Sequence, residues 1–112
     1  MFKIQAEASV KWPVTINIPR DGGNVTKAKC TVHFELIPND EFNAIYDNGG
    51  NDEDLLHRVV KGWGSDVADE DGNPLVFNED NLDKLLRISY ARVGLVQGYM
   101  ECSSGKAAAR KN

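Results

Sequence analysis

The sequence predicts an α+β fold in which an N-terminal antiparallel β-meander or hairpin packs against two or three C-terminal α-helices. Apolar and polar residues alternate through the first third of the chain, which is typical of strands with one buried face. After Pro38 the apolar residues recur at helical spacing instead. This change of period favours one α+β domain over residues 1–102, with its β part in 1–37 and its helical part in 39–102.

The β part contains three alternating runs. In residues 2–10 the even positions are apolar, and the same parity resumes in residues 14–18. Pro13 separates the two runs and marks a bend, a bulge or an edge, because proline donates no hydrogen bond to a sheet. After a loop signal at residues 19–24, the third run places four apolar side chains inward: Cys30, Val32, Phe34 and Leu36.

Two short helices are expected after Pro38. Asn39 is a suitable cap for the first, and the Asn-Gly-Gly of residues 48–50 ends it. The second begins at Asn51 or Asp52, and its apolar face comprises Leu55, Leu56, Val59 and Val60. Trp63 extends that face past the helix end, so we expect it to be a buried structural anchor.

A third, longer helix is capped by Asn78 and carries two apolar stripes. The first stripe should face the sheet and comprises Leu82, Leu85, Leu86, Val93, Val96 and Met100. A helix that is apolar on two sides packs on two partners, and the second partner is either the helix of residues 55–60 or another chain. The second stripe and its flanking glycines are therefore the candidate partner-binding residues: Ile88, Gly94, Leu95, Gly98 and Tyr99. Residues 103–112 lack apolar anchors and should form a flexible tail.

Charge is distributed unevenly along the chain. The net charge is −4, yet residues 39–83 contain thirteen acidic and two basic side chains, a local charge of −11. One interpretation is pairing between this acidic segment and the basic C-terminal part, within one chain or between subunits. The other is that these carboxylates lie where helices begin, where they complement the helix dipole.

Catalytic and metal-binding patterns are weak. The two histidines, His33 and His57, belong to no nucleophile–base pattern, and Asp54 with His57 is only half of a di-iron motif. The Asp69-Glu70-Asp71-Gly72 segment fails the EF-hand spacing and suits a turn. We expect no enzymatic activity, cofactor or metal.

Nucleic-acid and membrane binding are not expected either. An isoelectric point near 5.1 argues against nucleic acid, and no apolar run approaches the roughly 20 residues that span a bilayer. The two cysteines, Cys30 and Cys102, lie far apart, which favours free thiols in a reducing cytosol.

Several short motifs resemble one family. A helix ends in Val59-Val60-Lys61-Gly62-Trp63, an acidic turn follows at residues 69–72, and Pro74-x-x-Phe77-Asn78-x-x-x-Leu82 leads into the next helix. The early Trp12-Pro13-Val14-Thr15-Ile16 strand and the terminal Arg110-Lys111-Asn112 also fit. In this pattern the chain resembles the tail assembly chaperones of tailed bacteriophages and prophages.

The resemblance implies a non-enzymatic protein that binds and solubilises the tape measure protein and helps recruit tail-tube subunits. It implies residence in the host bacterial cytoplasm and absence from the mature virion. In that family a frameshifted extension contacts the tail-tube protein, and here it would join near residues 107–112. Weak self-association is also expected. The alternatives are a structural virion protein, such as a tail-terminator or head–tail joining subunit, and an acidic inhibitor of a host nucleic-acid enzyme.

Overall fold

A long β-hairpin is the central element of the fold. The computed structural model describes residues 1–4 and 8–107, in which β1 (Ala8–Pro19) and β2 (Val25–Leu36) pair antiparallel in continuous register. The turn between them contains the short 3-10 helix η1 (Asp21–Gly23), where Gly22 has the positive φ of 76° that glycine accepts readily. The short strand β3 (Val60–Trp63) pairs antiparallel with β2, so the strand order is β1-β2-β3.

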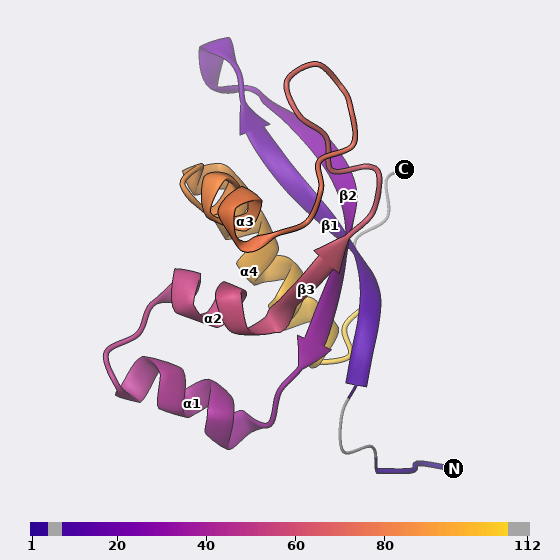
Figure 1. The fold of residues 1–112 in the computed structure, drawn as a ribbon, viewed down its shortest axis with the longest axis vertical. Helices are drawn as coiled ribbons and strands as arrows, with labels where there is room; N and C mark the ends of the chain where they lie inside the picture. The colour runs from indigo at the N-terminus through magenta and orange to yellow at the C-terminus, as the bar shows by residue number, and fades with distance from the viewer. Residues whose placement is uncertain (5–7, 108–112) are drawn as a thin grey trace.

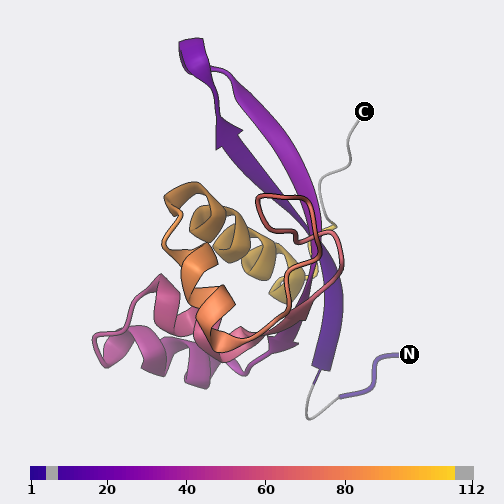
Figure 2. The same ribbon diagram turned by 45° about the horizontal axis from the view of Figure 1, so that its top comes forward.

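Four helices cover one face of this sheet, which confirms the predicted α+β class. They are α1 (Asn39–Asp47), α2 (Asp52–Val59), α3 (Glu79–Leu86) and α4 (Ser89–Ser103). Both views show all four on the same side of the curved hairpin, whose tip extends beyond them (Figures 1 and 2). Helix α4 makes the most extensive contact with β1, so it positions the hairpin against the helical layer.

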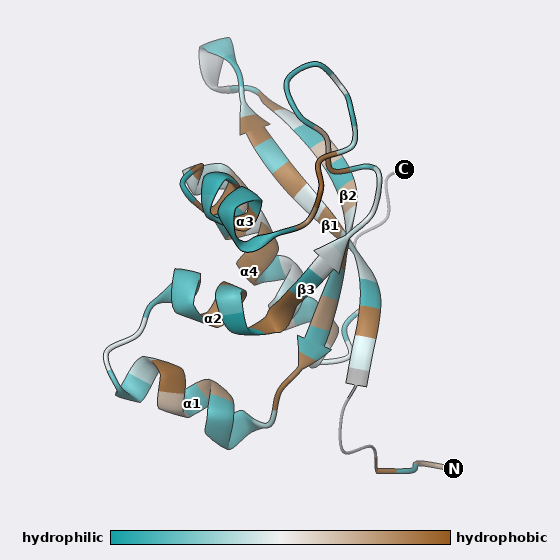
Figure 3. Cartoon of the chain, in the orientation of Figure 1, coloured by the Kyte–Doolittle hydropathy of each residue, from teal (hydrophilic) through white to brown (hydrophobic). Residues whose placement is uncertain are grey.

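The alternation along the hairpin sets which face is buried. Val14, Val32 and Phe34 are buried beneath the helices, and the alternating colours of β1 and β2 follow the same pattern (Figure 3). Pro13 lies on β1, an edge strand of the sheet, which is one of the three positions predicted for it. The first strand was expected to begin at residue 2, but β1 begins at Ala8, and residues 1–4 are exposed and have no regular structure, so that part of the prediction is wrong. Residues 5–7 lie outside the described part of the chain.

The second predicted helix continues into a strand that the sequence did not reveal. Helix α2 begins as expected, with Asn51 and Asp54 forming a reciprocal capping box. Val60, which was expected to lie on the helix, instead begins β3 and pairs with Phe34. The register shifts between His33 and Phe34, so β3 joins the sheet through an irregularity.

The third helix was predicted as one continuous element, but the structure has two helices there, α3 and α4. Asn78 caps α3 as expected, accepting a hydrogen bond from the Asn81 amide at 2.8 Å. The chain leaves the helical conformation at Ile88, whose ψ is 109°, and α4 begins at Ser89. In one straight helix the faces buried in α3 and in α4 would point in nearly opposite directions. The break lets both faces reach the core.

Trp63 is buried, as predicted, and anchors the connector between β3 and α3. Its side chain is 8% exposed, its indole Nε1 donates to the Leu75 carbonyl at 2.7 Å, and the Phe77 ring meets it edge-on at 4.8 Å. The acidic segment forms a turn, in which Oδ1 of Asp69 accepts from two backbone amides and Gly72 has a φ of 82°. The connector is thus attached to β3 by the Trp63–Leu75 hydrogen bond and the Trp63–Phe77 ring contact, and the turn at Asp69 is closed within the connector.

Helix α4 extends to Ser103, one residue into the segment predicted to be a flexible tail. Residues 104–107 are exposed, and the first two form a turn in which Gly105 has a positive φ of 73°. The remaining residues of the expected tail, 108–112, lie outside the described residues.

Candidate partner-binding surface

The structure places Leu95 and Tyr99, two of the predicted partner-binding residues, in the core. Leu95 is 0% exposed and Tyr99 is 1% exposed. The Tyr99 ring packs edge-on against Phe34 and stacks on Phe42, and its hydroxyl accepts a hydrogen bond from the Ile37 amide at 3.3 Å. These two residues therefore form no apolar strip on the surface. Of the two partners considered for the second stripe, α4 contacts α2 within the domain, so Leu95 and Tyr99 are core residues and are wrong as partner-binding candidates.

Gly94 and Gly98 are also buried, and the structure identifies what they approach. A Cβ atom added to Gly94 would lie 2.8 Å from the Thr15 carbonyl oxygen, and one added to Gly98 would lie 2.7 Å from Cγ2 of Val14. Both distances are shorter than side chains allow, so the glycines permit α4 to lie directly on β1. Of the five predicted residues only Ile88, at the break between α3 and α4, remains exposed.

The opposite face of α4 carries the exposed apolar residues. Val93 is 59% exposed and Met100 is 45% exposed, and Tyr90 is exposed to a similar degree. With the exposed Gln97 they follow a spacing of three, four and three residues, which places all four on one line along the helix. We call Tyr90, Val93, Gln97 and Met100 the outer seam of α4.

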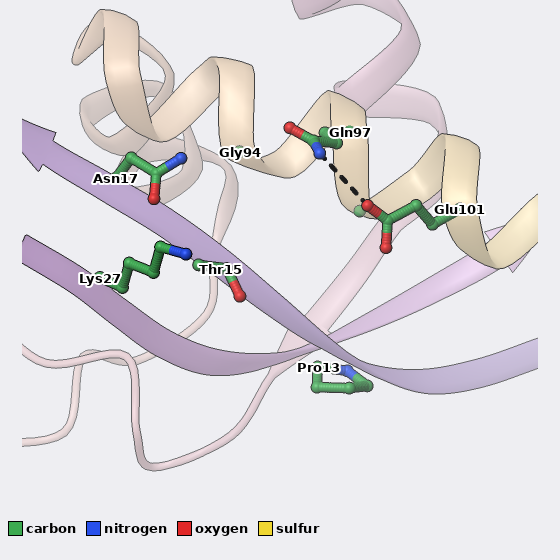
Figure 4. Close-up of a pocket in the computed structure, with 8 residues that line it drawn as sticks. Pro13, Thr15, Asn17, Lys27, Gly94, Gln97 and Glu101 are labelled. Carbon is green, nitrogen blue, oxygen red and sulfur yellow. Dashed lines mark hydrogen bonds between the residues drawn. The ribbon is translucent and has the colours of Figure 1, made fainter. Parts of the chain in front are cut away.

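A hollow lies between the outer seam and β1. Its volume is about 320 Å³, and Asn17 of β1 forms one wall while Tyr90, Val93 and Gln97 of α4 form the other. A second hollow of about 130 Å³ continues along β1 (Figure 4). There Gln97 donates to Glu101 at 3.3 Å, and both side chains come from α4, whereas Thr15 and Lys27 come from the hairpin. The seam is thus apolar at Tyr90 and Val93 and polar at Gln97, where it borders the second hollow.

Two ion clusters join α2 to its neighbouring elements. His57 of α2 lies between two carboxylates of α3, with Nδ1 at 2.8 Å from Glu79 and Nε2 at 2.7 Å from Asp83. Arg58 bridges Glu35 of β2 and Glu41 of α1 and lowers the pKa of Glu35. Both clusters connect neighbouring elements of the fold.

The described residues contain no group of three or more His, Cys, Asp or Glu side chains arranged to hold a metal ion. Within the same part of the chain, no helix is long and apolar enough to cross a membrane. Comparison with protein-family models, curated proteins and solved structures gave no match.

The apolar residues of the outer seam are recognisable in the sequence, but treating α3 and α4 as one long helix assigned them to the buried face. Val93 and Met100 were expected to face the sheet together with Leu82 and Leu86, because one uninterrupted helix places all four on one side. The break at Ile88 changes the rotational phase of the second half. Val93 and Met100 consequently lie on the solvent-exposed side of α4 instead of being buried against the sheet.

Proposed function

We propose that this protein is a tail assembly chaperone of a tailed bacteriophage, which binds helical segments of the tape measure protein in the host cytoplasm and is absent from the mature virion. The resemblance of the connector motifs supports the family. The observation that carries the binding role is the outer seam of α4, where apolar side chains lie exposed opposite the core face. Contiguous exposed apolar residues commonly mark protein-binding surfaces.

The spacing of the seam suits a helical client. Three- and four-residue intervals are the spacing at which one helix packs its side chains along another. The hollow beside Tyr90 and Val93 gives a client helix room to contact both α4 and Asn17 of the hairpin. An apolar client helix would bury its face here and so be kept from aggregating. Recruitment of tail-tube subunits through an extended product belongs to the same proposal.

Co-expression with the tape measure protein of the same phage genome tests this function. Wild-type protein should keep the tape measure protein in the soluble fraction and be captured with it. Val93→Glu introduces a charge into the seam and should abolish both effects, with circular dichroism as the folding control. The matched control is Val76→Glu, because Val76 lies in the connector and is 71% exposed. Retained solubilisation by Val93→Glu would place client binding elsewhere.

A further inference from the structure

We propose that the free edge of β2 at residues 25–30 binds an extended segment of another protein, in which apolar residues alternate with acidic ones and which adds a strand to the sheet. This site is separate from the outer seam of α4, and it does not depend on the proposed function.

The half of β2 nearest the hairpin tip has a strand on one side only. Strand β3 pairs with β2 at residues 32–34, and its pairing ends where the Gly64 amide donates to the Thr31 carbonyl at 3.0 Å. The Asp66 carboxylate closes this end, because it accepts from the Thr31 amide at 2.9 Å and from the Thr31 hydroxyl at 3.0 Å. Among the described residues, no strand pairs with residues 25–30 on the side away from β1 (Figure 1).

The backbone of this half of β2 presents donors and acceptors to the free edge. Thr31 makes its backbone hydrogen bonds on the side away from β1, and every second residue of an antiparallel strand faces the same side. The N–H and C=O groups of Lys27 and Val25, four and six residues earlier, therefore point outward. The hydrogen bond from the Arg20 amide to the Asn24 carbonyl at 2.7 Å agrees, because it makes the even-numbered pairs of the hairpin the ones bonded to each other. Such an edge is a template for a further strand.

A hollow beside this edge has room for an apolar side chain. Its volume is about 150 Å³, and it is lined by Ala28 and Cys30 of β2, Val67 of the connector and Leu85 of α3. Apolar cavities of about this size accept a benzene-sized group. A strand paired with residues 25–30 directs every second side chain to the helical face of the sheet, where the hollow lies. The residue opposite Ala28 should therefore be apolar.

Charge selects the residues between the apolar ones. The side chains of Lys27 and Lys29 are exposed on the other face of the sheet, and residues 25–30 include no acidic residue. Opposite charges on directly facing residues stabilise a pair of strands, and like charges destabilise it. The lysines therefore favour acidic residues at the facing positions. They disfavour a second copy of the same edge, because two such edges running antiparallel place lysine against lysine.

Nuclear magnetic resonance of the labelled full chain tests the site with synthetic peptides. The probe is acetyl-Asp-Val-Glu-Val-Asp-Val-Glu-amide. One control carries lysine at every acidic position, and the other has the composition of the probe in an order that does not alternate. The probe should shift the amide signals of residues 25–30 and slow the hydrogen exchange of the Lys27 amide, which should exchange fast in the free protein. Both controls should bind about tenfold more weakly.

Three results overturn the inference. In the first, either control binds as tightly as the probe. In the second, residues 25–30 show no shift at about 1 mM probe, the weak end of specific binding. In the third, the Lys27 amide exchanges slowly in the free protein, which means that a second copy or another part of the chain already covers the edge.

Two substitutions at Lys27 separate charge from backbone pairing. Lys27→Glu should weaken binding of the probe about threefold to tenfold, as expected when one exposed ion pair becomes a repulsion. Lys27→Pro removes the outward amide, which β1 does not use, and should weaken binding at least about tenfold. Lys11→Glu changes the charge of β1 by the same amount and is the matched control, with circular dichroism as the test of folding.

Wild-type affinity in Lys27→Glu contradicts the inference even where Lys27→Pro does not fold. Val93→Glu should bind the probe as wild type does, and loss of binding in this variant would contradict a separate site. Solubilisation of the tape measure protein is measured separately. Failure of the β2 site therefore leaves the proposed function standing.

Discussion

Gly94 lies so close to Thr15 that a methyl group on the glycine would sit 2.8 Å from the carbonyl oxygen of the threonine. This contact fixes how α4 is oriented on β1. Because one face of α4 lies against the strand through Gly94 and Gly98, the opposite face, with Val93 and Met100, is turned to solvent. The close approach in the core therefore determines which apolar residues the surface presents.

We predict that Gly94→Ala destabilises the protein. Alanine favours a helix over glycine by about 1 kcal/mol, but here the added methyl meets backbone rather than a flexible side chain. Overpacking of this kind costs about 1–3 kcal/mol, so the urea midpoint should fall. Gln97→Ala on the exposed side of the same helix is the control and should leave the midpoint nearly unchanged. A raised midpoint for Gly94→Ala would show that α4 moves away from β1 without cost.

Trp63→Ala should lower the free energy of unfolding by about 3–5 kcal/mol, because it removes a large buried ring. It also removes the hydrogen bond to Leu75 and the contact with Phe77. Trp63→Phe keeps an aromatic ring but removes the indole N–H, so it should lower the free energy of unfolding by less than Trp63→Ala does. The difference between the two variants separates the contribution of ring packing from that of the hydrogen bond to Leu75. The measurement is urea unfolding followed by circular dichroism. An unchanged midpoint in Trp63→Ala would mean that the connector does not depend on this anchor.

The pairing of His57 predicts a pH dependence of stability. Partial burial lowers the pKa of the ring, but the hydrogen bonds that the ring nitrogens donate to the carboxylates of Glu79 and Asp83 outweigh it, so the pKa of His57 lies above its ordinary value. A raised pKa in the folded state means that the stabilisation is complete below the unfolded pKa of about 6.5 and is lost as pH rises through the folded pKa.

Urea midpoints measured from pH 6 to pH 9 check this prediction. The wild-type midpoint should fall across that interval, and His57→Gln should remove most of the fall because glutamine does not titrate. Asp83→Asn is a second check, since it removes one of the two carboxylates that raise the pKa of His57 and should make the fall smaller. Identical pH profiles for wild type and His57→Gln would contradict the prediction.

Local patterns predicted much of the fold. The alternation that includes Val32 and Phe34 identified the buried face of the hairpin, and the side chains of Asn51 and Asn78 marked two helix starts that the structure confirms. These features depend on neighbours within a few residues. They are therefore visible without knowledge of the tertiary structure.

The elements that were missed depend on contacts distant in sequence. Val60 continues the helical spacing of α2, yet pairing with Phe34 of β2 makes it the start of a strand. The break at Ile88 has no glycine or proline to mark it and follows from the two faces that α3 and α4 must bury. Because of this break, the face of α4 that was expected to be exposed is buried, and the face that was expected to be buried is exposed. The sequence therefore identified the helix that bears the candidate site but not the correct face of it.

The most direct test of the proposed function is a titration of isotopically labelled protein with a helical tape measure peptide, followed by the chemical shifts of backbone amides. The protein concentration is kept below that at which self-association is detected. We predict that the largest changes occur in α4 at Tyr90, Val93 and Gln97 and in the facing part of β1, and that Val93→Glu removes them. Changes confined to the acidic segment of residues 52–71, with α4 unaffected, would contradict binding at the outer seam.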